Sequence, residues 1–557
     1  MRRCLFCAAL AACCPSSPSS PATTAASPKP ADFDAVANHV LDDLLVNSPL
    51  RAVGLGLHER DGELPDITPA GLAADVQRMH ADLASLDAVA PASLTPAQLE
   101  TRDALEIELR GDLFEREQLD DPHTNPIRYA QIGLDAYVVR PYAPIAQRAA
   151  AVAKLCTALP GYLAQARQNL KLPMPRTWID IALLQFKGLI DFVQHDVRAQ
   201  LGDQPALATC TSALTDQVAW LEQQQPQGTN AYALGTDKFL GMLAANEGFT
   251  ITLPALQKLA DDTLARDSAA LAEAAHAIDP NKTPAEVVAS LASDRPSDTL
   301  GAGTQIAAEL RQFLIDHKIV TVPPDETCEV RASPPFQRWN AAFLDGPGPF
   351  EHTVMPYFYY ISPPDPTWPA EEQQAYLMPR TNLVFTTVHE VYPGHFIQAL
   401  HTRRNSSRAA QMLRSYMTGE GWAHYAEQMM YEEGAGGKTP QAHVGQLTEA
   451  LLRDVRFVVA IGEHTGGMTV EQAEALFSGK AFQDPGNAHQ QAVRGTFDPM
   501  FLSYTVGKLA IQKLRTDWMA KHPGATLGQF HDEFLAHAPL PMSVIRRAMM
   551  GDDSPIL

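Results

Sequence analysis

The chain has 557 residues, of which 45% are hydrophobic and 19% are charged, and its formal net charge at pH 7 is −21. This composition is typical of a soluble globular protein, and the length predicts two or more domains or lobes. The acidic balance argues against nucleic acid as a partner, because nucleic-acid-binding proteins carry basic patches that neutralise phosphates. After residue 30, no apolar run is long enough to suggest a transmembrane helix.

The first thirty residues are predicted to be an export signal and a tether, and not part of the fold. A basic start, "MRR", precedes a short apolar stretch, "CLFCAALAAC", and a segment rich in Pro, Ser and Thr follows. This order is typical of a bacterial export signal, and its apolar stretch is too short to span a bilayer. Residues 10–13, Leu-Ala-Ala-Cys, resemble a bacterial lipobox, in which the cysteine is lipidated and becomes the mature N-terminus.

Lipidation of Cys13 predicts a lipoprotein of the cell envelope that faces the periplasm and touches the membrane only through its lipid. The alternative is cleavage after a small residue, which would release a soluble periplasmic or secreted protein. Four of the seven cysteines lie in or beside the signal, so Cys156, Cys210 and Cys328 can form at most one disulfide in the body of the protein. Whether any two of them are paired stays open.

The rest of the chain has the pattern of successive helices. Thr-Pro pairs at residues 68–69, 95–96 and 283–284 place a hydroxyl at a helix N-cap and proline at the first helical position. The segments that follow have helical apolar spacing and almost no β-branched runs. Thr469 and Gln472 have the spacing of a capping box. The sequence therefore predicts a mainly α fold.

Strand-like runs are few, and the best are "PYFYYI" at residues 356–361 and "NLVFTTV" at residues 382–388. They predict a small β element near the motif described next. A passage rich in Pro and Gly at residues 332–356 marks the entry into a second region. We therefore divide the chain after the signal into an N-terminal helical region, 31–340, and a catalytic helical region, 341–557.

The stretch "VHEVYPGHFIQ", residues 388–398, resembles a zinc-protease signature. The short zincin motif places two histidines four residues apart, on one face of a helix. Here His389 and His395 are six residues apart, which in a regular helix would turn their side chains roughly 120° away from each other. The motif can form a metal site only if the helix is interrupted between them.

The residues inside the motif favour such an interruption. Pro393 cannot donate a hydrogen bond to the carbonyl of His389, and its ring crowds that carbonyl. Tyr392, which precedes the proline, is also pushed away from helical backbone angles. Gly394 is expected to permit whatever backbone angle resumes the chain. We therefore expect a bulge that re-aims His395 towards His389.

A catalytic zinc ion needs a third protein ligand and one open position. In "SYMTGEGWAHYAEQMMYEEG", residues 415–434, Glu420, His424 and Glu427 share one face of a helix. A solvated polar stripe is the alternative, but the neighbouring Trp, Tyr, Ala and Met residues are too apolar for an exposed helix. A buried carboxylate needs a metal or a cation as partner. Glu420 is the predicted third ligand.

Four stretches carry a resemblance to a known family: "GLGLHERDGELPD" (54–66), "TTVHEVYPGHFIQ" (386–398), "GEGWAHYAEQ" (419–428) and "PMFLSYTVGKLAIQKLR" (499–515). The chain resembles the bacterial domain-of-unknown-function family 885, which includes many predicted lipoproteins. In the arrangement of its sequence motifs, that family is similar to the helical gluzincin metallopeptidases, such as thimet oligopeptidase and the Taq-type carboxypeptidases. Dipeptidyl peptidase III likewise carries a lengthened zinc motif.

The resemblance implies a mostly helical, two-lobed fold around a central cleft. It implies one zinc ion per chain held by His389, His395 and Glu420, with Glu390 as the catalytic base. The expected function is that of a gluzincin-like zinc metallopeptidase, a zinc-dependent hydrolase of peptide bonds that acts on peptides in the cell envelope. Glu390 would take a proton from the attacking water and pass it to the leaving amine.

The resemblance also points to residues outside the motif. The helical gluzincins place a tyrosine from a late segment against the oxyanion, which indicates Tyr504. Arg494 is a candidate for binding a substrate carboxylate, because a planar guanidinium suits that group. His424 could orient a zinc ligand from behind. The alternative for Tyr504 and Arg494 is structural, as a tyrosine at the edge of the core and a surface arginine.

Two other classes of function stay open. A metal-containing binding lipoprotein without turnover would keep Glu420 but could dispense with Glu390, whose presence favours an enzyme. A zinc amidase or esterase acting on a non-peptide substrate would have the same residues. Serine hydrolysis is disfavoured, because no Gly-x-Ser-x-Gly elbow occurs. The sequence leaves open endo- versus exopeptidase cleavage, the residues preferred and the oligomeric state.

Overall fold

The computed structural model describes residues 32–324, 327–334, 337–338, 340–364 and 366–557. The predicted export signal, including the lipobox at Cys13, lies outside the described residues. Within the described part of the chain, no helix combines the length and the apolar character needed to cross a bilayer.

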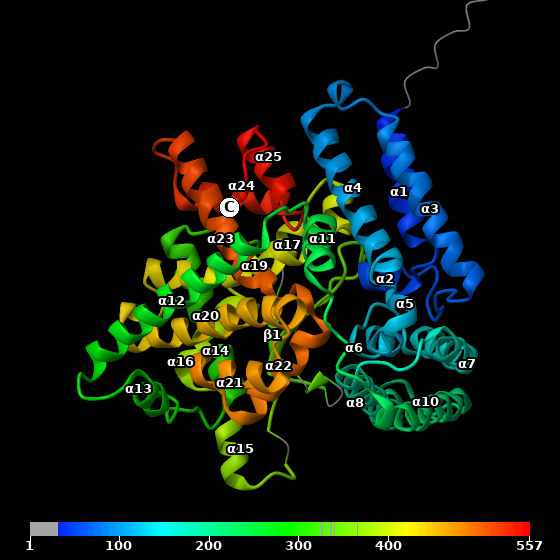
Figure 1. The fold of residues 1–557 in the computed structure, drawn as a ribbon, viewed down its shortest axis with the longest axis horizontal. Helices are drawn as coiled ribbons and strands as arrows, with labels where there is room; N and C mark the ends of the chain where they lie inside the picture. The colour runs from blue at the N-terminus through cyan, green and yellow to red at the C-terminus, as the bar shows by residue number, and fades with distance from the viewer. Residues whose placement is uncertain (1–31, 325–326, 335–336, 339, 365) are drawn as a thin grey trace, which may run out of the picture.

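The predicted mainly α fold is confirmed (Figure 1). The helices before the sheet are α1 (Phe33–Val46), α2 (Pro49–Leu55), α3 (Pro69–Asp87), α4 (Pro96–Glu117), α5 (Asp121–Thr124), α6 (Leu134–Val139), α7 (Ile145–Asn169), α8 (Arg176–Phe192), α9 (Arg198–Leu201), α10 (Pro205–Gln224), α11 (Thr236–Glu247), α12 (Leu253–Ile278), α13 (Pro284–Leu291) and α14 (Thr299–His317). Those after it are α15 (Ala370–Tyr376), α16 (Arg380–Glu390), α17 (His395–Arg403), α18 (Arg408–Met412), α19 (Tyr416–Glu433), α20 (Pro440–Ile461), α21 (Val470–Lys480), α22 (Pro485–Phe497), α23 (Ser503–Lys521), α24 (Leu527–His537) and α25 (Met542–Met550).

The predicted helix starts are confirmed. The side chains of Thr68, Thr95 and Thr283 are N-caps of α3, α4 and α13, and each accepts a hydrogen bond from the backbone N–H three residues later. Thr469 and Gln472 form the predicted capping box at the start of α21. A threonine cap of this kind satisfies a backbone donor that would otherwise have no partner in the first turn.

A small mixed sheet precedes the motif. Its strands are β1 (Cys328–Ala332), β2 (Ala342–Asp345) and β3 (Tyr357–Ile361), in the order β1-β3-β2. The central strand β3 pairs parallel with β1 and antiparallel with β2, and all five of its residues are buried. The strand predicted at residues 356–361 is therefore confirmed.

The strand predicted at residues 382–388 is wrong, because these residues form most of α16. Both faces of this helix are covered, since it packs against α14, α19 and α20. Periodicity alone does not separate a short buried helix from a strand, and here tertiary packing outweighs the β-branched composition. The hydroxyl of Thr387 donates to the carbonyl of Leu383 at 2.7 Å, so this β-branched residue is accommodated within the helix.

Two large hydrophobic clusters organise the helices, and a small third cluster lies between α12 and α20. The larger of the two extends from Phe33 in α1 to Ile556, beyond α25, and contains Phe385 and Trp422, so it draws on both sides of residue 340. The other is built mainly by α7, α8 and α10, which lie together below α1, α3 and α4 in Figure 1. The division of the chain at residue 340 stays a prediction. Cys156 and Cys210 lie in the second cluster, and these two residues and Cys328 are free thiols.

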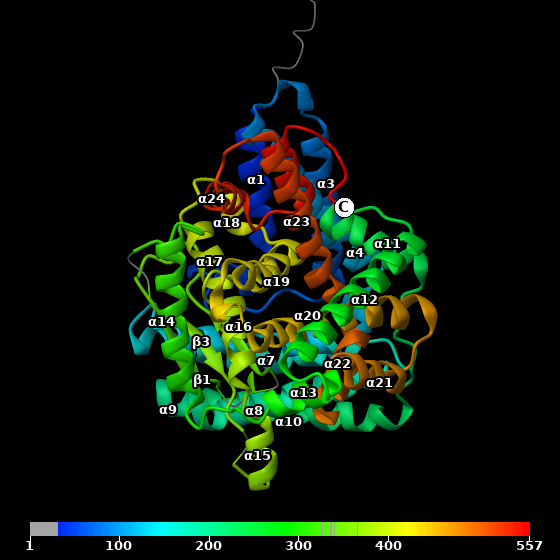
Figure 2. The same ribbon diagram turned by 90° about the vertical axis from the view of Figure 1, so that its left-hand side faces the viewer.

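The helices that carry the motif lie in the interior of the molecule. Figure 2 shows α16, α19 and α20 between α14 on one side and α12 on the other. Helices α19 and α23 approach each other closely, since a Cβ added to Gly421 would lie 2.5 Å from the Cα of Gly507. Because neither residue has a side chain, the two helix backbones touch at this point. This contact brings the helix that carries Glu420 against the helix that carries Tyr504.

Candidate metal centre

The predicted interruption of the motif helix is confirmed. Helix α16 ends at Glu390 and α17 begins at His395, so the intervening residues form a break around Pro393. The N–H of Gly394 returns to the carbonyl of Val388 at 2.9 Å. The indole N–H of Trp422 in α19 donates to the carbonyl of Pro393 at 2.9 Å and ties the break to that helix.

Two observations explain glycine at position 394. Its backbone angles, φ −63° and ψ −133°, lie in neither the helical nor the extended region, as the predicted change of direction at this residue requires. A Cβ at this position would also lie 1.7 Å from the carbonyl oxygen of His389. Gly394 is required because the chain folds back onto the end of α16 with no room for a side chain.

The break brings the three predicted ligands together. Nε2 of His389 and Nε2 of His395 lie 3.3 Å and 3.4 Å from the same oxygen, Oε2 of Glu420. The two imidazole rings are edge to face, with centroids 4.9 Å apart and an interplanar angle of 87°. Among the described residues, that Glu420 oxygen is buried yet accepts no hydrogen bond of acceptable geometry. The three groups therefore point at a common space rather than bonding directly to one another.

Glu427 holds His389 from behind. It is fully buried, and its Oε1 accepts a hydrogen bond from Nδ1 of His389 at 2.6 Å. This contact leaves Nε2 of His389 free to face the cluster, as carboxylates that support metal-bound histidines do. His424, which was predicted to orient a zinc ligand, has its Nδ1 3.3 Å from Oε2 of Glu427, so it contacts the carboxylate that holds His389. Nη2 of Arg453 lies 3.5 Å from Oε1 of the same carboxylate.

The electrostatics of the cluster suit a bound cation. Burial disfavours a charged imidazole at His389, but the neighbouring carboxylates of Glu420 and Glu427 outweigh it and raise the pKa of His389 to about 10. Burial also favours a neutral carboxyl at Glu420, yet His395 and His389 hold the pKa of Glu420 well below its usual range. The cluster thus retains a proton between its histidines and carboxylates, and a divalent cation binding to Nε2 of His389 would displace that proton.

The donor set fits zinc. Two imidazole nitrogens and one carboxylate oxygen are a known ligand set of catalytic zinc sites, which keep a fourth position for water or substrate. The ligating atoms of His389, His395 and Glu420 all lie within 4.8 Å of one another. These three residues would hold the ion, and Glu427 would fix the orientation of the first.

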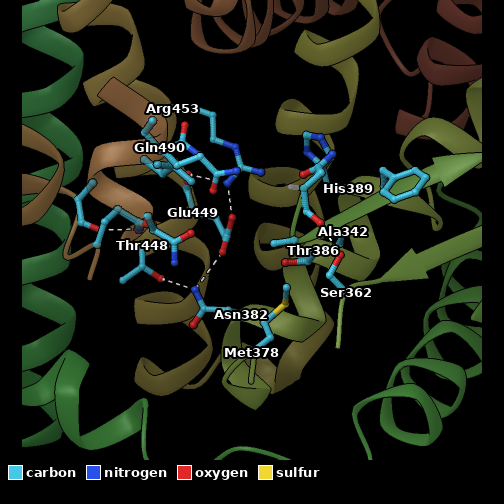
Figure 3. A pocket seen from close by; sticks show the side chains of 18 of the residues that line it. Ala342, Ser362, Met378, Asn382, Thr386, His389, Thr448, Glu449, Arg453 and Gln490 are labelled. Atoms are coloured by element: carbon cyan, nitrogen blue, oxygen red, sulfur yellow. Dashed lines mark hydrogen bonds and ion pairs between the residues drawn. The ribbon is translucent and has the colours of Figure 1, made fainter. Parts of the chain in front are cut away.

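A cavity of about 650 Å³ opens beside this cluster and is lined by all three predicted ligands and by Glu390. Glu390 is 8% exposed, and it adjoins the cluster because it directly follows His389 in the last turn of α16. Figure 3 shows His389 on one wall, with Arg453 and Glu449 of α20 facing it across the space. The sequence-predicted base therefore shares a cavity with the predicted ligands.

Tyr504 also lines this cavity, and it is 6% exposed. Its ring is stacked with that of His389, with centroids 6.2 Å apart and an interplanar angle of 18°. Its hydroxyl lies 3.5 Å from Nη2 of Arg494. This position combines contact with a predicted ligand and access to the cavity, so the hydroxyl is placed where a substrate could meet it.

Arg494 lines the cavity but is already engaged. Its Nε donates to Oδ2 of Asp498 at 2.9 Å, and its Nη2 donates to the hydroxyl of Tyr416 at 2.8 Å. An arginine paired in this way has less to gain from a substrate carboxylate. Its observed contacts support the position of Tyr504 and the adjacent helix end more directly than a role in substrate binding.

Sequence reasoning missed two further arginines, Arg453 and Arg456 of α20, which line the cavity and are 7% and 6% exposed. They stand three residues apart in "LLRDVRFVVAI", a stretch that is otherwise largely apolar. Charged residues at helical spacing within an apolar run are rarely buried without a partner. That pattern was the signal that could have revealed them.

A second cavity, of about 1460 Å³, adjoins the first and shares Ile181, Asp484 and Gln490 in its lining. Glu463 lines it from the π-helical turn η7 (Gly462–Gly466). Within the described residues, neither carboxylate oxygen of Glu463 has a hydrogen-bond partner, and the side chain is fully buried. Burial raises the pKa of Glu463 to about 8.

This carboxyl predicts a pH-dependent stability. The folded protein keeps the Glu463 proton up to about pH 8, whereas the unfolded chain releases it near the ordinary value of 4.5. Since the folded state binds more protons in that window, the free energy of unfolding falls as pH rises from 4.5 to 8, by on the order of a few kcal/mol. Glu463→Gln removes this loss, so its melting temperature should match wild type near pH 4.5 and exceed it near pH 8. Equal melting temperatures at both pH values would contradict this assignment.

The fold and the site define a mainly helical protein with a His/His/Glu cluster on the wall of a cavity. The chain belongs to the family described as bacterial protein of unknown function, DUF885, whose profile matches residues 49–549. No curated protein matches the chain.

Two solved structures share the fold. One, described as a putative lipoprotein of unknown function from Shewanella oneidensis, superposes with a TM-score of 0.77 at 24% identity, covering 93% of this chain and 100% of the other. The other, described as the putative lipoprotein from Colwellia psychrerythraea, has a TM-score of 0.76 at 16% identity, covering 93% of this chain and 98% of the other. At these identities the likeness extends to the fold alone.

Proposed function

We propose that this protein is a zinc-dependent hydrolase of peptide bonds, with chemistry like that of the gluzincin metallopeptidases. The observation that carries the proposal is the convergence of His389, His395 and Glu420 on one space, beside Glu390 and at the wall of a cavity. Within the part of the chain that the structure describes, no donor forms a hydrogen bond with the Glu420 oxygen that faces both histidines, which is the condition expected of an oxygen that serves a cation. A purely structural cluster would instead satisfy that oxygen with a donor.

In the proposed reaction, the zinc ion and the side chains of the protein have separate roles. When bound, zinc supplies polarisation of the scissile carbonyl and a lowered pKa for the attacking water. Glu390 accepts the proton of that water and passes it to the leaving amine. The hydroxyl of Tyr504 donates to the oxygen on which negative charge develops. Glu427 keeps His389 in the orientation that the site needs.

We further propose that the protein acts in the cell envelope, anchored by a lipid on Cys13. The lipobox-like residues 10–13 support this location, and both structural relatives are described as putative lipoproteins. Labelling of the wild type by fatty acid, lost in Cys13→Ser, is the expected result. Unchanged labelling of the variant would favour the alternative of a soluble periplasmic or secreted protein.

The function is tested by incubating the purified protein with a peptide library and identifying products by mass spectrometry, with and without a chelator. Cleavage that a chelator abolishes and zinc restores is the expected result. Metal binding without cleavage of any peptide would instead indicate a metal-containing binding protein. Cleavage confined to non-peptide amides or esters would indicate a zinc amidase or esterase.

A further inference from the structure

Arg456 of α20 is a buried guanidinium at the cavity beside the candidate metal centre. Its Nε donates to Oε1 of Gln491 at 2.8 Å, and its guanidinium carbon lies 4.8 Å from the centre of the Tyr504 ring. Both partners are neutral. Among the described residues, no carboxylate forms an ion pair with Arg456.

The other arginines that line this cavity are satisfied. Arg453 is ion-paired with Glu449, and Arg494 with Asp498. Arg295 donates from Nε to the carbonyl of Leu377 at 2.7 Å. Unlike Arg453 and Arg494, Arg456 forms no ion pair with a carboxylate of the described residues.

This arrangement is unfavourable unless an anion completes it. A buried charge without a partner is costly, and the guanidinium groups of Arg494 and Arg453 are close enough to oppose the charge of Arg456. Burial, followed by the charge of Arg494, lowers the pKa of Arg456 to about 10. The group still carries its charge at neutral pH, so it is available to an anionic ligand there. Planar guanidinium groups bind carboxylates with two parallel hydrogen bonds.

The position of Arg456 limits which carboxylate could reach it. Tyr504 connects the two parts of the site, since its ring centre lies 4.8 Å from the guanidinium carbon of Arg456 and 6.2 Å from the ring centre of His389. An extended peptide advances about 3.3–3.6 Å per residue. A carboxylate held by Arg456 would thus belong to a residue within a few positions of the scissile bond.

We propose that Arg456 forms a subsite for a substrate carboxylate, and that this carboxylate is the free carboxyl terminus of a peptide cleaved close to that end. The inference rests on the proposed function and adds a substrate class to it, that of an exopeptidase acting from the carboxyl end. The same guanidinium could also take the side chain of an acidic residue, so the test separates the two sources of carboxylate.

The test is a binding measurement on the zinc-loaded, full-length Glu390→Gln protein, which is expected to bind substrate without turning it over. Calorimetry compares tetra-alanine, tetra-alanine amide, and an amidated tetrapeptide with glutamate at the third position. The free acid should bind roughly 10–100-fold more tightly than its amide, as expected for a hydrogen-bonded charged pair. Adding Arg456→Gln should abolish that preference and leave the binding of the amide little changed.

Two further variants make the result specific. Arg456→Lys keeps the positive charge but loses the two parallel N–H donors of the guanidinium, so it should retain part of the preference for the free acid. This variant provides the test if Arg456→Gln folds poorly. Arg380→Gln removes an exposed arginine, paired with Asp294 at 3.6 Å, and should keep the full preference. If the amidated glutamate peptide binds as tightly as the free acid, the subsite takes a side chain and the exopeptidase assignment is overturned.

Failure of this inference differs from failure of the proposed function. If the free acid has no advantage in the Glu390→Gln protein, or keeps it in Arg456→Gln, the subsite is overturned even if the wild type cleaves peptides. If the preference exists and depends on Arg456 while the wild type cleaves no peptide, the subsite stands and the hydrolase proposal fails.

Discussion

Replacing Glu390 by glutamine is expected to lower peptide hydrolysis by roughly 10²–10⁴-fold, the usual contribution of a general base. The substitution keeps the size and polarity of the side chain but removes its ability to accept a proton. Glu390 makes no ion pair with the three predicted ligands, so metal content and fold should stay close to wild type. Rates on a cleaved peptide, measured with zinc per chain on the same preparation, give the result.

The matched control is Glu432→Gln, which removes an exposed carboxylate near the end of α19. Its rate should equal that of the wild type, because it lies on the solvent side of the helix that carries Glu420. An unchanged rate for Glu390→Gln would mean that another residue of the cavity is the general base. A loss of zinc together with activity would instead make Glu390 a structural part of the centre.

Replacing Tyr504 by phenylalanine is expected to lower kcat by about 10²–10³-fold, the typical effect of removing one oxyanion donor. The hydroxyl acts when charge has developed on the carbonyl oxygen, so kcat and kcat/KM should fall by similar factors while substrate affinity changes little. Zinc content should not change, because the ring that stacks on His389 is kept.

A structural role for the Tyr504 hydroxyl predicts a different outcome. Loss of its contact with Arg494 would lower stability by about 1 kcal/mol and leave turnover unchanged. Tyr416→Phe is the matched control, since Tyr416 also contacts Arg494 and donates to Asp498 at 3.1 Å. It should lower the melting temperature without the loss of kcat. Full kcat in Tyr504→Phe with a lowered melting temperature would remove Tyr504 from the site.

Local signals in the sequence predicted much of the fold. Thr68, Thr95 and Thr283 were identifiable as caps because the hydroxyl and the following proline act within one turn. The break at Pro393 was predictable for the same reason, since its physics is confined to neighbouring residues. The strand prediction at residues 382–388 failed because the environment of α16 is set by helices distant in the sequence.

The candidate site was predictable only where its residues share a short segment. His389, His395 and Glu420 could be proposed from spacing and resemblance, and the structure brings them together. Which carboxylate supports His389 depends on the rotation of α19 against α16, and spacing along one helix does not determine that.

The contacts of the cavity arginines could not be predicted from the spacing of residues along the sequence. Arg494 was visible in the sequence, but its pairing with Asp498 depends on how the end of α22 folds. Whether Arg456 has a counter-ion depends on side chains from α22 and α23, which meet α20 only in the folded protein.

Metal content tests the central claim most directly. The purified wild type should contain about one zinc ion per chain, and His389→Ala, His395→Ala and Glu420→Ala should each lose most of it. Glu427→Gln should weaken zinc binding by roughly 10–100-fold, as loss of a residue supporting a ligand does, but still load fully in excess zinc. Full zinc in Glu420→Ala, or no zinc in the wild type after incubation with the metal, would contradict the proposed centre.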